Sequence, residues 1–209
     1  MTPEHLQRID AILRAAPVVP VLAIDDLDDA VPLARTLVDA GLPVLEVTLR
    51  TPVALDAIRR MRDVPGAIIG AGTVLSAHDL AAVEAAGGMF AISPGATDAL
   101  YAAAKASNIP FLPGIATASE LMHGLEHGWT RFKFFPAEAS GGIVALKGFA
   151  GPFPQVKFCP TGGIDAAKAP AYHALPNVLT VGGSWMVLGD ALKAKDWARI
   201  GALAREAVG

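Results

Sequence analysis

Lys133 is the first residue in this sequence that could do chemistry. It stands in RFKFFP (131–136), between aromatic residues of an expected buried strand. Lysine is almost never fully buried unless it has a partner or a function, because moving an ammonium out of water is costly. Alternation along a strand points Phe132 and Phe134 to one face and Arg131, Lys133 and Phe135 to the other.

A second segment, VLEVTLR (44–50), carries an acid, a hydroxyl and a guanidinium on one face. Glu46, Thr48 and Arg50 alternate there with apolar residues. If the apolar side faces helices, the polar side faces the interior of the sheet. Lys133 and Glu46 are then expected to share one cavity.

That pair has two interpretations. A buried ion pair that only fills space stabilises a fold weakly, because desolvation offsets the attraction. In the functional interpretation, burial and the nearby Arg50 disfavour the ammonium form of Lys133 and leave a nucleophilic amine. Such an amine attacks ketones, the resulting iminium acidifies the adjacent carbon, and Glu46 moves protons directly or through one water.

The elements that must position these residues alternate along the chain. Eight short apolar segments are expected to be strands, at 18–24, 44–49, 67–72, 89–93, 110–115, 131–135, 156–160 and 178–183. Alanine- and leucine-rich segments with helical periodicity separate them, several opened by Ser, Thr or Asp and closed by Gly or Asn. This alternation predicts an α/β TIM (β/α)8 barrel, with residues 1–209 as a single domain.

The N-terminal segment is an extra helix in this scheme. It is expected to close the barrel floor or to pack outside. An open doubly wound sheet is the alternative fold, and it often carries a glycine-rich fingerprint after its first strand. AIDDLDDA (23–30) follows the first strand here and lacks that fingerprint, so the barrel is favoured.

Glycine-rich turns follow the last two expected strands. Thr161, Gly162 and Gly163 end the seventh strand, and Gly182, Gly183 and Ser184 end the eighth. Loops at these positions of such barrels frequently hold a phosphate through backbone N–H groups. No Lys or Arg lies within these turns, so backbone dipoles and hydroxyls are expected to hold the anion.

Three other residues are weaker candidates. His123 and His127 are four apart on an expected outward-facing helix, but the sequence shows no accompanying carboxylate cluster. We interpret them as surface histidines and predict no metal site. Cys159 is interpreted as a small apolar residue of a barrel strand.

Composition excludes several classes of protein. The 209 residues are 53% hydrophobic and 18% charged, with a net charge of −3. No apolar run approaches the roughly 20 residues of a membrane-spanning helix, and no basic run indicates nucleic-acid binding. One cysteine and an N-terminal segment without a signal-peptide core favour a cytoplasmic location.

Taken together, seven motifs resemble the bacterial 2-keto-3-deoxy-6-phosphogluconate (KDPG) aldolases. FKFFPAE and the Glu-x-Thr-x-Arg strand are the most specific, and the similarity spans nearly the whole chain. The motifs are APVVPV (16–21), VLEVTLRT (44–51), GAGTVL (70–75), FAISPG (90–95), FKFFPAE (132–138), FCPTGG (158–163) and GGSW (182–185).

This resemblance implies a class I aldolase barrel that assembles as a homotrimer. It implies cleavage of KDPG to pyruvate and glyceraldehyde 3-phosphate in Entner-Doudoroff metabolism, without metal or organic cofactor. Many members also accept 4-hydroxy-2-oxoglutarate (KHG), and some decarboxylate oxaloacetate. It further implies that Lys133 forms the Schiff base, Glu46 is the acid/base, and Arg50 with Thr73 holds the pyruvyl carboxylate.

The resemblance also assigns the remaining site residues. Pro94 and Phe135 shape the pyruvate pocket, and Thr161 lies near a substrate hydroxyl. The turns at 162–163 and 183–184 hold the phosphate.

Three alternatives stay open at this point. The first is an aldolase for the galactonate-series epimer, which differs from KDPG at one stereocentre. The second is a phosphosugar epimerase or isomerase, which would use paired carboxylates or a metal and form no imine. The third is a non-catalytic sensor of a phosphorylated metabolite, which would leave the Lys133, Glu46 and Arg50 cluster without a role.

Overall fold

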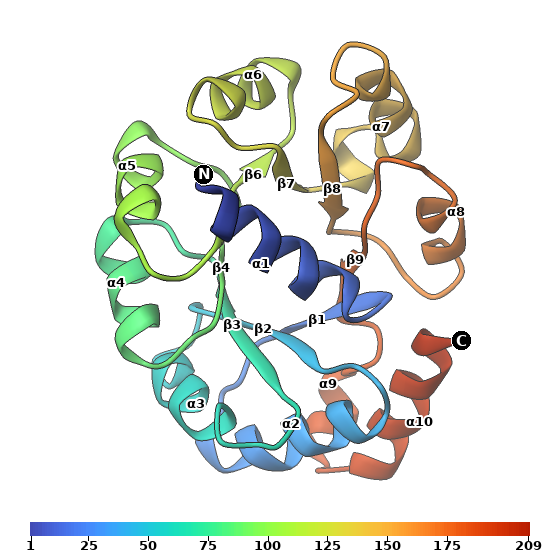
Figure 1. Cartoon of the computed structure of the whole chain (residues 1–209). Helices are drawn as coiled ribbons and strands as arrows, with labels where there is room; N and C mark the ends of the chain where they lie inside the picture. Colours follow the sequence, from blue (N-terminus) through green and yellow to red (C-terminus); the bar gives the residue numbers. More distant parts are fainter.

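The computed structural model describes residues 1–209, and strands surrounded by helices make up the fold (Figure 1). The strands are β1 (Val18–Leu22), β2 (Val44–Thr48), β3 (Ile68–Gly72), β4 (Ala91–Ile92), β5 (Phe111–Leu112), β6 (Gly114–Ile115), β7 (Arg131–Phe134), β8 (Lys157–Pro160) and β9 (Val181–Gly183). The α-helices are α1 (Pro3–Arg14), α2 (Ala30–Asp39), α3 (Ala54–Met61), α4 (Ala77–Ala85), α5 (Asp98–Ala106), α6 (Ala118–Glu126), α7 (Gly142–Ala150), α8 (Ala169–His173), α9 (Gly189–Lys193) and α10 (Trp197–Val208). Two 3-10 helices are η1 (Leu27–Asp29) and η2 (Glu138–Ser140).

All strand pairs are parallel, and the strands form two curled sheets. The six-stranded sheet has the order β5-β4-β3-β2-β1-β9, and the three-stranded sheet has the order β6-β7-β8. Isolated parallel bridges join Phe158 to Val178 and Thr161 to Gly182, between the β8 and β9 regions. The result is a curled parallel sheet with an outer layer of helices, which agrees with the predicted α/β class.

The fifth predicted strand (110–115) differs from the expectation, because Pro113 divides it into β5 and β6. Proline has no N–H to donate, so the ladder is interrupted at this residue. The Pro113 carbonyl still accepts a hydrogen bond from the backbone N–H of Lys133 at 2.9 Å. The chain therefore pairs with β4 before the proline and with β7 after it.

Two apolar clusters hold the fold together. The larger contains 47 buried residues between strands and helices, including Phe132 and Phe134, both fully buried as their predicted face requires. The smaller lies inside the curled sheet, where residues of α1 pack on strand residues; its members are Ile9, Ile12, Leu13, Val19, Val44, Phe90, Ile92, Leu112 and Cys159. Figure 1 shows α1 lying across one end of the strands. Helix α1 thus closes one end of the curled sheet, and we refer to it as the floor.

Capping and long-range pairing fix α1 in that position. The Thr2 hydroxyl accepts a hydrogen bond from the backbone N–H of His5, and Pro3 occupies the first turn, where its missing N–H costs nothing. Arg131, at the start of β7, makes a bidentate ion pair with Asp10 of α1, including an Nη2–Oδ2 contact of 2.9 Å. Arg131 lies on the inner side of its strand, as predicted, and its side chain binds α1 through Asp10.

The helices are short. The longest, α1 and α10, have 12 residues each. None has the length and apolar character needed to cross a bilayer.

Candidate active site

Lys133 and Glu46 meet across the interior of the curled sheet. Lys133 Nζ lies 2.9 Å from Glu46 Oε1, and the two residues are only 6% and 1% exposed. Alternation places both side chains above the floor, because Val44 of the same β2 face belongs to the inner apolar cluster. The structure therefore contains the buried amine–carboxylate pair that the two strand patterns predicted.

The pair lines a cavity of about 290 Å³. This cavity brings together seven residues named from the sequence: Glu46, Arg50, Thr73, Pro94, Lys133, Phe135 and Thr161. Val21 and Thr48 complete the lining. Residues from six separate strands or strand ends thus converge on one space.

Thr48 connects the backbone to Arg50. Its hydroxyl donates to the Leu22 carbonyl at 2.8 Å, and its oxygen accepts from Arg50 Nε at 3.1 Å. No carboxylate of the protein pairs with Arg50, so the outer nitrogens of its guanidinium are available to an anion. Sequence analysis placed Thr48 on the polar face but gave it no role, since a side-chain hydrogen bond to a neighbouring strand leaves no pattern in sequence.

The end of β3 is shaped around the carboxylate of Glu46. A Cβ on Gly72 would lie 2.0 Å from Glu46 Oε1, so only glycine leaves room for that side chain. The next residue, Thr73, has a φ of 59°, a left-handed conformation that β-branched residues rarely adopt. This backbone conformation belongs to a residue that lines the cavity.

Phe135 and Cys159 complete the surroundings of the amine. Lys133 Nζ lies 5.3 Å from the centroid of the Phe135 ring, within cation–π range. Burial raises the pKa of the Cys159 thiol to about 12, so the residue stays a protonated, apolar thiol. Its place in the inner apolar cluster agrees with the interpretation made from sequence.

The two glycine turns lie outside the lining of this cavity but begin next to it. Thr161, which lines the cavity, bridges to Gly182 at the other turn. Gly162 and Gly163 have φ values of 106° and 78°, and a Cβ on Gly163 would lie 2.9 Å from Glu138.

A cation lies beside the first turn, outside the turn residues themselves. Lys168 Nζ donates to the Gly163 carbonyl at 2.7 Å and lies 3.0 Å from a carboxylate oxygen of Glu138. The Tyr172 hydroxyl also donates to Glu138, and this bond, followed by the one from Lys168, lowers the pKa of the Glu138 carboxyl. Lys168 was missed because five residues and a turn separate it from Gly163.

The geometry indicates one kind of chemistry. An amine that can attack a ketone touches a carboxylate that can exchange protons with it, beside an unpaired guanidinium suited to a substrate carboxylate. Parallel α/β strands with these groups near their carboxyl ends define an imine-forming, class I aldolase. The chain belongs to the KDPG and KHG aldolase family, whose sequence profile matches residues 9–203.

Individual relatives agree with this assignment. The KHG/KDPG aldolase of Escherichia coli (strain K12) is 57% identical over 95% of this chain and 94% of that protein. The crystal structure of KDPG aldolase from Legionella pneumophila, with pyruvate captured as a covalent carbinolamine intermediate, is 50% identical, with a TM-score of 0.93, covering 96% of this chain and 98% of that one. The KDPG aldolase of Zymomonas mobilis ZM4 with 3-phosphoglycerate is 53% identical, with a TM-score of 0.93, covering 96% and 95%. The protein is thus a carbon–carbon lyase.

Proposed function

We propose that this protein cleaves KDPG to pyruvate and glyceraldehyde 3-phosphate, and KHG to pyruvate and glyoxylate. The buried contact of 2.9 Å between Lys133 and Glu46, in a cavity that also holds Arg50, carries the proposal. The name of the Escherichia coli relative covers both substrates. An epimerase or isomerase is disfavoured, because the cavity holds one carboxylate, Glu46, and not a pair.

Binding places the substrate for attack. The carboxylate of the 2-oxo acid binds the free guanidinium nitrogens of Arg50, with Thr73 beside it, and the C2 ketone then faces Lys133. Glu46 accepts a proton from Lys133 Nζ, and the neutral amine adds to C2. The carbinolamine loses water to give an iminium. Holding the reactants in one cavity supplies much of the rate, since fixed orientation can be worth about 7–11 kcal/mol of the barrier.

Cleavage then uses the iminium as an electron acceptor. Glu46, directly or through one water, removes the proton of the C4 hydroxyl. The C3–C4 bond breaks, its electron pair moves toward the iminium nitrogen, and the aldehyde leaves an enamine on Lys133. Protonation of C3 and hydrolysis of the imine release pyruvate and restore the free amine. The carbinolamine captured in the Legionella protein supports this route.

The glycine turns account for the phosphorylated end of KDPG. We propose that backbone N–H groups of Gly162, Gly163, Gly183 and Ser184 bind the phosphate, as such turns do in parallel barrels. Thr161 lies between the cavity and both turns, within reach of a substrate hydroxyl.

Reductive trapping tests the proposal. Borohydride added in the presence of pyruvate should reduce the imine and leave one covalent adduct, which peptide mass spectrometry should place on Lys133. Lys133→Ala should form no adduct and have no turnover, whereas Lys105→Ala, which removes an exposed lysine of α5, should behave as the unaltered protein. An adduct on another lysine, or turnover nearly intact in Lys133→Ala, would refute the assignment. Assaying both C4 epimers separates KDPG from the galactonate series.

Three further properties belong to the proposal. The two sheets act as one (β/α)8 barrel, supported by the bridges at Thr161 and Phe158 and by the continuity of β5 with β6. The protein is a homotrimer, and exposed Leu75 and Val144, 62% and 80% exposed, are apolar surface that an interface would bury. Light scattering should then give three times the 21.5 kDa chain mass. Its single, buried cysteine suits a cytoplasmic location.

A further inference from the structure

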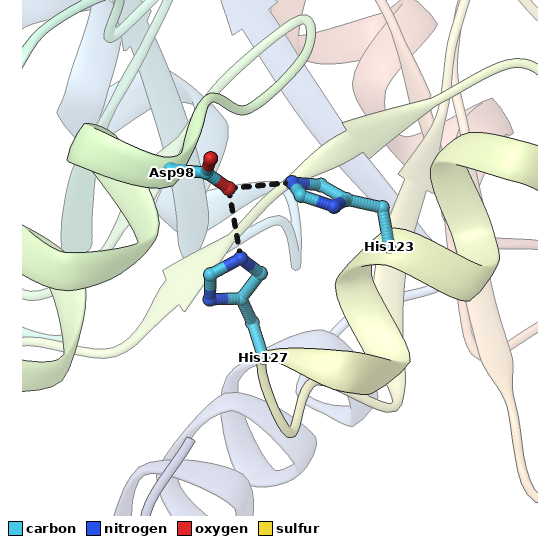
Figure 2. Close-up of side chains that lie close together, drawn as sticks. All are labelled: Asp98, His123 and His127. Carbon is cyan, nitrogen blue, oxygen red and sulfur yellow. Dashed lines mark hydrogen bonds and ion pairs between the residues drawn. The ribbon is translucent and has the colours of Figure 1, made fainter.

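A second group of reactive side chains lies away from the catalytic cavity. His123 of α6 and His127, the residue that follows the end of α6, both approach Asp98, the first residue of α5 (Figure 2). His123 Nε2 and His127 Nε2 are each 3.0 Å from the same oxygen, Asp98 Oδ1. The sequence indicated two isolated surface histidines; the fold supplies the carboxylate, from a residue 25 positions before His123.

We propose that Asp98, His123 and His127 form a binding site for one zinc ion that joins α5 to α6. The three ligand atoms lie within 4.8 Å of one another. Zinc binds imidazole nitrogen and carboxylate oxygen at about 2.0–2.2 Å in tetrahedral geometry, which separates neighbouring ligand atoms by about 3.3 Å. The two nitrogen–oxygen distances of 3.0 Å are close to this separation, whereas the two histidine nitrogens, which lie within 4.8 Å of each other, take up the remaining adjustment when the ion binds.

The contacts within the cluster are compatible with a bound cation. The His127 contact has the alignment of a hydrogen bond, whereas the His123 contact is a close approach without that alignment. Both nitrogens thus lie 3.0 Å from one carboxylate oxygen, and only the nitrogen of His127 is hydrogen-bonded to it. A cation between the three atoms would engage both lone pairs and the carboxylate charge.

Packing holds the imidazole rings in this arrangement. Tyr101, buried on α5, stacks on His127 with centroids 4.5 Å apart and planes at 7°. The same ring meets His123 edge-on at 5.6 Å and 68°. Because both rings contact one buried aromatic residue, the ligands lose less rotational freedom on binding than free surface histidines would.

Ligand type and access select the ion. Two nitrogen ligands favour zinc or another late first-row metal over calcium or magnesium, which prefer all-oxygen sites. The side chains of Asp98 and His123 are 79% and 40% exposed, and His123 also borders a separate cavity of about 260 Å³. Water can therefore complete a fourth coordination position. The three residues are absent from the lining of the catalytic cavity, so the ion has no part in the cleavage.

Zinc titration of the untagged full-length protein, cleared of metal with a chelator, tests the site. Competition against a chromophoric chelator should give one zinc per chain. His127→Phe keeps an aromatic ring against Tyr101 but removes one zinc-binding nitrogen, and His123→Gln removes the other. Each variant should bind zinc at least tenfold more weakly, because the loss of a residue that only hydrogen-bonds a metal ligand already costs about tenfold. His78→Gln, which alters an exposed histidine of α4, is the matched control and should bind as the unaltered protein does.

Two further measurements distinguish this site from non-specific binding of zinc to the protein surface. At a hundredfold excess over the dissociation constant, zinc should raise the melting temperature by roughly 5–10 °C in the unaltered protein and in His78→Gln only. Cobalt should give the visible absorption of a tetrahedral ion in the same two proteins. Circular dichroism and aldolase turnover, equal in all four, confirm that the variants fold. The proposal is overturned if the unaltered protein does not bind one zinc ion per chain, or if all four proteins bind zinc equally well.

Discussion

Replacing Gly72 with alanine should displace the Glu46 carboxylate and leave the other residues of the cavity in place. A Cβ at residue 72 would lie 2.0 Å from Glu46 Oε1, 2.7 Å from its Cδ and 2.8 Å from its Cγ. Reaching an ordinary separation of 3.4 Å requires the oxygen to move by about 1.4 Å, which removes it from its 2.9 Å contact with Lys133. Gly72 does not have a positive φ, so alanine meets no backbone strain there.

The magnitude follows from the displacement. A misplacement of about 1 Å in a catalytic group costs on the order of a hundredfold in rate, so kcat of Gly72→Ala should fall by about that factor. Overpacking a buried site should also lower the free energy of unfolding by about 1–3 kcal/mol. The KM should change little, because Arg50 and Thr73 stay in place. A lactate dehydrogenase-linked assay of pyruvate release measures the rate, and thermal unfolding measures the stability.

Two variants make this result interpretable. Gly148→Ala, in α7, places its Cβ where nothing lies within 4 Å, so it should keep full activity and gain up to about 1 kcal/mol of stability. Combining Gly72→Ala with Glu46→Asp shortens the crowded side chain, and the pair should recover stability while activity stays low. If Gly72→Ala turned over within about threefold of the unaltered enzyme, the hundredfold dependence on carboxylate position would be refuted.

Three further predictions concern other parts of the molecule. Thr48→Val removes the hydroxyl that holds Arg50 Nε, so KM for the keto acid should rise by about tenfold to 150-fold, the worth of one charged hydrogen bond, with a smaller change in kcat; an unchanged KM would contradict the positioning role. Because burial raises the pKa of Cys159 to about 12, the folded protein should resist thiol alkylation near neutral pH and react only on unfolding, as mass spectrometry can check. Hydrogen bonds from Asn108 and Ser107 lower the pKa of the Glu84 carboxyl, so their stabilisation is present at neutral pH and is lost as pH falls through the folded-state pKa. Glu84→Gln should therefore unfold more easily than the unaltered protein near neutral pH, and the gap between their unfolding curves should close in acid.

The central pair could be predicted from sequence because strand alternation is a local property. Phe132 and Phe134 had to face one way, and this alone sent Lys133 the other way, into the same interior as Glu46. The seven cavity-lining residues named from sequence followed from the same rule and from the resemblance. Lumen-facing polar residues in apolar strands are expensive to bury, so they stand out in the pattern.

The features that sequence missed all depend on contacts between distant segments. Asp98 reaches His123 and His127 only because α5 and α6 are neighbours in the ring, and no periodicity within either helix reports that. Lys168 meets the Gly163 carbonyl across a turn whose shape depends on two left-handed glycines. Pro113 was visible in the sequence, but the division of the fifth strand also depends on which strands lie on either side of it. The chain pairs with β4 before the proline and with β7 after it.

The floor built by α1 determines the order in which products can depart. Ile9, Ile12 and Leu13 of α1 fill the inner end of the curled sheet, beneath the amine of Lys133. We therefore expect substrate and products to enter and leave only at the rim formed by the carboxyl ends of the strands. In the proposed mechanism, the three-carbon fragment stays tethered to Lys133 at the innermost point, and the aldehyde fragment lies between it and the rim. Glyceraldehyde 3-phosphate must therefore exit before pyruvate can. Pyruvate, as the last to leave, should compete directly with the incoming sugar acid for the vacant enzyme.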